Sequence, residues 1–253
     1  MELNMTKFQL ERWLELKEYS LPNITMTKAE TQDSEYIKME KNNRILGRSF
    51  HHSFERWFKK YRRIPTPQEF IAMQMLDIKK NYANEGWKRK YKVTFRWTAT
   101  VEKGIKQRLL RSYKSFINEI HTELIIKELY PSYQIIRNDE LDYSGIDLLV
   151  IDRKNNINHK IHITKNSEYA IDFLFKKEGK KVEFRGYGSN MFARPIWKGI
   201  NHSEYKRRSF KGHTFFLYAD APNDYIRVVN GYPLFKETYV RMKIDVVTAI
   251  RTA

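Results

Sequence analysis

Residues 143–165 read YSGIDLLVIDRKNNINHKIHITK, and this stretch decides the fold. Two apolar, β-prone segments, residues 146–151 and 160–164, flank a polar run that is typical of a turn. The pattern therefore predicts two adjacent strands joined by a short connection. One acidic residue, Asp147, stands at the beginning of the otherwise apolar first strand. A carboxylate at that position needs a structural or a functional explanation.

The segments around this strand pair predict a sheet with helices packed against it. Residues 111–130 (RSYKSFINEIHTELIIKELY) have the apolar spacing of an amphipathic helix, which ends before Pro131. Residues 169–177 fit a helix or a strand, and a helix is favoured because after the third strand it would cover the sheet. The remaining predicted elements are strands at 133–137, 213–219 and 225–229, a tight turn at Asn230 and Gly231, and a closing helix at 236–252.

The first half of the chain is predicted to be helical. Thr27-Lys28-Ala29-Glu30 and Thr66-Pro67-Gln68-Glu69 each place a hydroxyl at an N-cap and a glutamate three residues later, which is the capping-box pattern. The second motif predicts a helix over residues 67–83 that Gly86 ends. The basic and aromatic residues 87–100 are consistent with a linker, a short strand pair or the rim of a nucleic-acid groove.

This change of pattern divides the chain into two predicted domains. Residues 1–95 form a helical domain for recognition of nucleic acid or of a partner, and residues 96–253 form an α/β domain. The predicted fold class is α+β or α/β, with helices in front and a sheet domain behind.

The net charge is the strongest compositional signal. The chain has 47 Lys and Arg against 30 Asp and Glu, a formal charge of +17. Such a charge attracts polyanions, and nucleic acid is therefore the expected partner. The alternative is a lysine-rich composition imposed by an AT-rich genome. The basic clusters Lys59, Lys60, Arg62, Arg63 and Lys88, Arg89, Lys90, together with Arg185, Lys198, Arg207 and Arg208, are the predicted nucleic-acid-binding residues.

Several other chemistries lack their sequence signals. The chain has no cysteine, which excludes disulfides, thiol nucleophiles and thiolate metal sites. It has neither the phosphate-binding loop of an NTPase nor the nucleophile elbow of a hydrolase. No apolar run of about twenty residues and no signal peptide is visible, so we expect a cytoplasmic protein that does not associate with membranes.

The order of helix, strand and strand, with the Gly145-Ile146-Asp147 step, resembles the core of the PD-(D/E)XK nuclease superfamily. The resemblance covers about residues 111–219 and implies a restriction-endonuclease-like αβββαβ fold. It also implies Mg²⁺ or Mn²⁺ held by carboxylates, which would activate a water molecule for hydrolysis of a phosphodiester bond. Asp147 occupies the position of the second-strand aspartate, and Glu123, with Glu119 one turn earlier, that of the helix acid.

The third-strand motif departs from the superfamily pattern. The acid and the lysine, two residues apart on one face of the strand, are replaced by His162 and Thr164. Lys165 is expected on the opposite face unless a bulge turns it inward. The implied site is therefore Asp147, His162, Lys165 and Glu123 for catalysis, with Asp147, Glu123, Glu119 and His162 as metal ligands.

Each of these residues also has a purely structural interpretation. Asp147 at a strand start is compatible with a capping role, and Glu119, Glu123 and His162 with exposed positions. Two functions therefore remain open. The first is a divalent-metal-dependent DNA endonuclease, in which two copies related by two-fold symmetry would cut both strands. The second is a catalytically inactive DNA-binding protein of the same fold, acting as a subunit in transposition, replication or defence.

Overall fold

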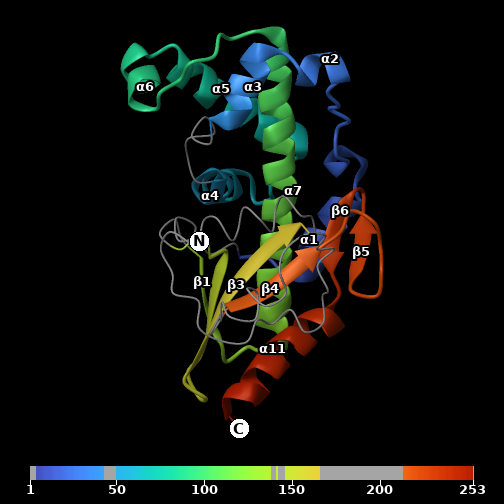
Figure 1. Ribbon diagram of the computed structural model, residues 1–253. Coiled ribbons are helices and arrows are strands. Elements are labelled where there is room, and N and C mark those ends of the chain that lie inside the picture. Colours follow the sequence, from blue (N-terminus) through green and yellow to red (C-terminus); the bar gives the residue numbers. More distant parts are fainter. Residues whose placement is uncertain (1–3, 43–49, 138–140, 142–145, 166–212, 253) are drawn as a thin grey trace. The chain divides into compact units, whose positions relative to one another are not determined.

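The computed structural model describes residues 4–42, 50–137, 141, 146–165 and 213–252. In these residues the chain forms helices, a mixed four-stranded sheet and a two-stranded hairpin, so the expected mixed class of helices and strands is confirmed (Figure 1). Two compact units are distinguished, one of Leu14–Phe116 and the other of Met1–Trp13 with Ile117–Ala253. The division falls inside a long helix, whereas the sequence pattern places a boundary near residue 95.

The described elements are labelled as in Figure 1. The helices are α1 (Lys7–Glu15), the 3-10 helix η1 (Lys17–Tyr19), α2 (Lys28–Thr31), α3 (Ser34–Lys41), α4 (Phe50–Tyr61), α5 (Pro67–Tyr82), α6 (Glu85–Lys90), α7 (Ala99–Leu129) and α11 (Glu237–Thr252). The strands are β1 (Gln134–Ile136), β2 (Leu148–Asp152), β3 (Ile157–Lys165), β4 (His213–Tyr218), β5 (Ile226–Val229) and β6 (Tyr232–Phe235).

The two predicted capping boxes form. The side chain of Thr27 accepts a hydrogen bond from Glu30 N, and that of Thr66 accepts one from Glu69 N, while each glutamate accepts from the backbone N–H of its threonine. These bonds satisfy N–H groups that the first turn of a helix leaves without partners. The helix predicted over residues 67–83 is thus confirmed as α5.

Two local predictions in this region are wrong. Gly86 does not end a helix but lies inside α6, because the side chain of Asn84 caps Trp87 N at 3.0 Å and begins a new helix there. The helix predicted from residue 111 begins at Ala99, because Thr98 Oγ1 accepts a hydrogen bond from Val101 N at 3.1 Å. No strand forms in residues 91–98.

The unit of residues 14–116 has a core of helices packed around aromatic side chains. The rings of Phe54, Phe70 and Tyr113 lie 5.2–5.6 Å apart between centroids, and Phe54 contacts Phe116 at 4.6 Å. Helices α3 and α7 approach closely at Gly104, where a Cβ atom would lie 2.6 Å from the ring of Tyr36. These contacts hold α4, α5 and α3 on the N-terminal part of α7.

The second unit contains the sheet, with strand order β1-β2-β3-β4. The first three strands are antiparallel neighbours, and β4 pairs with β3 in parallel. The strands predicted at 133–137, 146–151, 160–164 and 213–219 are therefore confirmed. Residues 166–212, which connect β3 to β4 and include the helix predicted at 169–177, lie outside the described residues.

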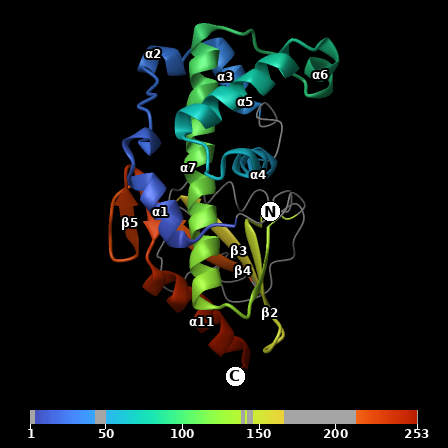
Figure 2. The ribbon, with the colours of Figure 1, turned by 180° about the vertical axis from the view of Figure 1, so that it is seen from behind.

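The core of this unit lies between one face of the sheet and helices α7 and α11 (Figure 2). Buried side chains at alternate positions of β2 and β3 supply the sheet side of the core. The contributing residues include Ile125 and Ile126 from α7, Val240 and Ile244 from α11, and Leu148, Val150, Ile161 and Phe216 from the sheet.

The β5–β6 hairpin and the closing helix α11 follow the sheet. Asn230 and Gly231 have φ values of 47° and 87°, which is the left-handed pair that a two-residue hairpin turn requires. The predicted turn and the predicted strand before it are confirmed. In the described ranges of the chain, no helix combines the length and apolar composition needed to cross a bilayer.

Candidate metal site and nucleic-acid interface

Asp147 lies immediately before β2, and its carboxylate is used to complete the sheet. Its backbone N–H donates to Ile161 O at 2.9 Å, and its Oδ2 accepts from Ile163 N at 2.5 Å. The carboxylate thus accepts a hydrogen bond from β3 that a backbone carbonyl of a neighbouring strand would otherwise accept. Extending the β2–β3 register by one residue places Asp147 opposite His162. The capping interpretation of Asp147 therefore has direct geometric support.

His162 is fully buried and packs as an aromatic side chain. Its ring is stacked on that of Phe215 from β4, with centroids 4.7 Å apart and ring planes 13° from parallel. His162 and Phe215 are also register partners on the two parallel strands. The alternative interpretation that His162 faces solvent is therefore wrong, because its side chain is buried.

The alternation of side chains along β3 places Lys165 and His162 on opposite faces of the strand. The β3–β4 register runs without interruption from Lys160 to Lys165, so no bulge changes the alternation of side chains. Lys165 forms an ion pair with Asp220 at the end of the strand. The structure therefore does not bring Lys165 to the face of the sheet from which His162 projects.

Glu123 is buried in α7 and forms ion pairs with two cations. Its Oε2 lies 3.0 Å from Arg137 Nη2, and its Oε1 lies 2.8 Å from Lys127 Nζ. The side chains of Glu123 and Arg137 are 6% and 2% exposed. The solvent-facing interpretation of Glu123 is therefore wrong, and its carboxylate neutralises a buried guanidinium. Glu119, one turn earlier, is partly buried.

These positions do not combine into a metal centre in the part of the chain that the structure describes. There, no group of three or more His, Asp or Glu side chains is arranged to hold a metal ion. Two acids of the predicted site act on protein groups instead: Asp147 accepts a hydrogen bond from a backbone amide, and Glu123 pairs with Arg137 and Lys127.

The basic cluster at the end of α4 is partly neutralised by neighbouring acids. Lys59 pairs with Glu55 at 2.9 Å, and Arg63 makes a two-pronged contact with Glu69 at 2.5 and 2.7 Å. The Arg63 guanidinium and the capping bonds of Thr66 lower the pKa of Glu69 to about 2, against the opposing effect of burial. Arg63 therefore stabilises the start of α5.

Other cations of this cluster remain accessible. Lys60 lies over the ring of Tyr61, with Nζ 4.9 Å from the ring centroid. Arg62 is exposed, has a left-handed φ of 55°, and makes no ion pair with a described residue. The cluster predicted from sequence thus contains both cations used by the fold and cations that face solvent.

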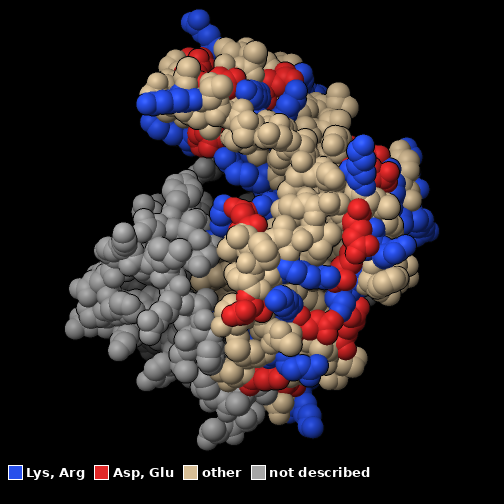
Figure 3. Space-filling model, turned by 90° about the vertical axis from the view of Figure 1, so that its right-hand side faces the viewer, with Lys and Arg blue, Asp and Glu red and all other residues tan. Residues whose placement is uncertain are grey.

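The basic cluster on α6 has more exposed cations. Lys88 pairs with Glu85 and lies over the ring of Tyr82, with Nζ 4.9 Å from the ring centroid. Arg89 and Lys90 are exposed and make no ion pair with a described residue. On the face shown in Figure 3, by contrast, Lys and Arg side chains are interspersed with Asp and Glu. Arg185, Lys198, Arg207 and Arg208 lie outside the described residues.

A polar network that the sequence did not predict joins α1, α7 and β5. Oε1 of Glu11 contacts His121 Nε2 at 2.8 Å and is also paired with Arg227. Burial lowers the pKa of His121 and keeps its ring neutral, although the adjacent Glu11 opposes this shift. Burial alone would raise the pKa of Glu11, but its bonds to His121 and Arg227 outweigh that effect and lower it to about 2.

No local sequence signal connects these three residues, because more than one hundred positions separate Glu11 from His121. Arg137 also lacks a local sequence signal, because its partner Glu123 lies in the preceding helix. Comparison of the chain with protein-family models, with curated proteins and with solved structures gives no match.

Proposed function

We propose that this chain is a DNA-binding protein that holds duplex DNA through its phosphates and does not cleave it. One observation carries the proposal: Asp147 accepts a hydrogen bond from a backbone amide and Glu123 forms ion pairs, while Arg89, Lys90 and Lys92 on and beside α6 face solvent and form no ion pair with a described residue. Phosphate contacts by exposed Lys and Arg supply most of the affinity of sequence-independent DNA binding.

The sheet supports a restriction-endonuclease-like core as the scaffold. A long helix is followed by three antiparallel strands and then by a fourth strand parallel to the third, and this order of elements agrees with the αβββαβ core expected from the resemblance. In this proposal the core is a member of that fold whose third-strand acid and lysine are replaced by His162 and Thr164.

Metal-dependent cleavage is a second candidate function, favoured by the position of Asp147 opposite His162 on neighbouring strands. A carboxylate and an imidazole are both ligands of divalent ions, and Mg²⁺ or Mn²⁺ would be the expected cofactor. The present bonds of Asp147 favour a structural role, since its Oδ2 accepts from Ile163 N.

The affinity for duplex DNA is expected to fall steeply with salt. About five phosphate contacts correspond to a slope of about −4 to −5 in a plot of log affinity against log salt, since each contact contributes about −0.9. Affinity would then fall by about 10²–10³-fold between about 50 and 200 mM salt. Fluorescence anisotropy with a labelled duplex measures this slope, and an affinity that does not change over this range would contradict phosphate binding.

A further inference from the structure

We infer that the phosphate-contacting surface is built by five cations, Lys80 at the end of α5, Arg89 and Lys90 on α6, and Lys92 and Arg96 in the segment after it. This assignment rests on the proposed DNA binding and specifies its site. Residues 79–96 contain seven Lys and Arg against one acid, Glu85, a net formal charge of +6. Only Lys79 and Lys88 of the seven form ion pairs with described acids, Glu102 and Glu85. The other five are all exposed.

Contacts between the aromatic residues of this stretch hold the backbone from which the cations project. The Tyr82 hydroxyl donates to Phe95 O and accepts from Trp97 N, both at 3.1 Å, and thus ties the segment after α6 back to α5. The Tyr82 ring also packs on Trp97 and Phe95, with centroids 5.0 and 5.6 Å apart. The cations therefore project from a segment with fixed ends.

The backbone conformation of Lys92 is an independent sign that the charge is used. Lys92 has a left-handed φ of 50° directly after α6, where Lys92 N donates to Arg89 O at 3.2 Å and Val93 N donates to Lys88 O at 2.9 Å. Glycine is the residue that this helix end favours, because a side chain is sterically disfavoured there. A lysine in that position carries the steric cost of the left-handed conformation, and its charge offers a reason for its presence.

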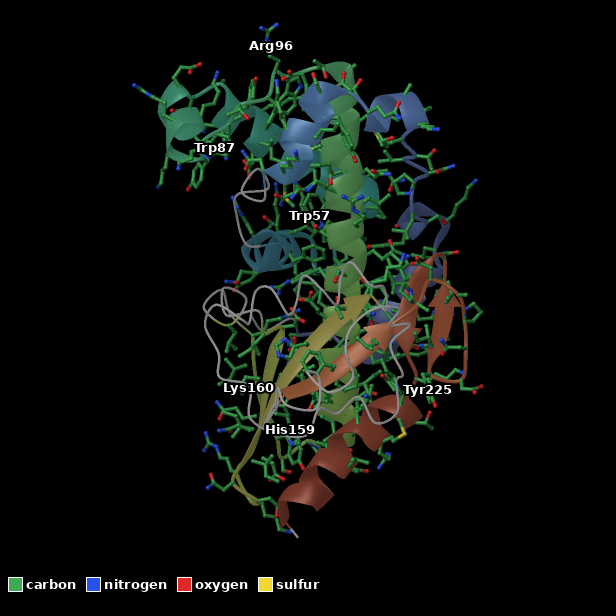
Figure 4. All side chains as sticks on the ribbon, in the orientation of Figure 1. Trp57, Trp87, Arg96, His159, Lys160 and Tyr225 are labelled. Carbon is green, nitrogen blue, oxygen red and sulfur yellow. The ribbon has the colours of Figure 1, made fainter. Side chains whose placement is uncertain are left out.

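The side chain of Arg96 is directed outward. Its backbone N–H donates to the carboxylate of Glu35, which fixes the peptide in place. Figure 4 shows the Arg96 side chain extending away from the ribbon, and it shows Trp87 on the adjacent α6. The backbone of Arg96 is anchored and its guanidinium points outward, so the side chain is suited to contact a DNA phosphate, whose oxygens accept hydrogen bonds from Arg.

Two variants of the full chain, each with four substitutions that remove the same charge, test the assignment. The test variant carries Arg89→Gln, Lys90→Gln, Lys92→Gln and Arg96→Gln. The control carries Lys79→Gln, Lys103→Gln, Lys106→Gln and Lys127→Gln, which removes the same charge from lysines that are paired with Glu102, Glu30 and Glu123. Binding of a fluorescein-labelled duplex is measured for both against salt. In a plot of log affinity against log salt, we expect the slope of the test variant to be smaller by about 3.6, since each of four lost phosphate contacts contributes about 0.9. The slope of the control should change by less than about one.

A single variant separates binding from folding. Lys92→Gly should melt at the same temperature as the wild type or higher, since glycine suits the left-handed position, yet its salt slope should be smaller by about one. Equal losses in the two four-fold variants, or a larger loss in the control, would overturn the assignment while DNA binding itself stands. Wild-type protein that does not bind the duplex would instead refute the proposed function.

Discussion

The Glu123→Ala variant is expected to lose about 3–5 kcal/mol of unfolding free energy, because it leaves the buried Arg137 guanidinium without its carboxylate. Both side chains are almost fully buried, and Glu123 Oε2 lies 3.0 Å from Arg137 Nη2. Water could replace the carboxylate beside the guanidinium only by entering the buried interior. Chemical denaturation followed by far-ultraviolet circular dichroism measures the change in unfolding free energy.

Two further variants distinguish this ion pair from a metal site. Lys127→Ala removes the more exposed partner of Glu123 and is expected to cost less than about 1 kcal/mol. Glu123→Leu combined with Arg137→Met should be more stable than Glu123→Ala, since it removes the buried cation together with its carboxylate. Carboxylates gathered for a metal repel one another when the metal is absent. Unchanged or increased stability of metal-free Glu123→Ala protein would therefore contradict the structural role.

Acidification is expected to weaken the sheet unit through Glu11. Its pKa is about 2 in the folded chain against an ordinary value of 4.5, because His121 and Arg227 bond to the carboxylate and outweigh the effect of burial. A carboxyl whose pKa is lowered by folding stabilises the fold above its unfolded pKa. This stabilisation, about 3 kcal/mol, is lost as the pH falls from about 4.5 towards 2.

His121 extends the same pH dependence to a higher range. Its pKa is lowered by burial, so the unfolded chain takes up a proton below its ordinary value of 6.5 before the folded chain does. Stability therefore begins to fall below about pH 6.5, and Glu11 adds to the loss below about 4.5. Since the buried ring is neutral at pH 7, Arg227 supplies the positive charge beside Glu11.

The Glu11→Gln variant isolates the carboxyl contribution. We expect it to be less stable than the wild type at neutral pH and to lose less stability between about pH 5 and 2. Unfolding free energies measured at intervals from pH 7 to 2 give the difference between the two proteins. Parallel curves would show that the carboxyl of Glu11 does not carry the predicted stabilisation.

The parts of the fold that the sequence predicted are those fixed by neighbouring residues. The capping box of Thr66 and Glu69 spans four positions, and the Asn230-Gly231 turn needs only two residues with left-handed φ. The strands follow from runs of apolar residues, whose alternation sets the buried face of the sheet. The start of α7 was missed, although Val101, Ile105 and Leu109 recur at helical spacing and are fully buried.

The functional residues were harder to predict, because their roles depend on distant partners. The sequence located Asp147 at a strand start, but only the fold places Ile163 N against its carboxylate. Glu123 was identified as a candidate ligand, yet its partner Arg137 follows β1 and carries no motif. The charge clusters were visible in the sequence, while the division between paired cations such as Arg63 and exposed cations such as Lys92 required the structure.

The most direct test of the central claim is a gel assay of plasmid DNA with the wild-type protein in Mg²⁺, in Mn²⁺ or in EDTA, beside the Asp147→Ala variant. A DNA-binding protein without cleavage predicts a retarded but intact plasmid in all three conditions. Metal-dependent nicking that disappears in Asp147→Ala would contradict this account and establish a nuclease with an altered third-strand motif.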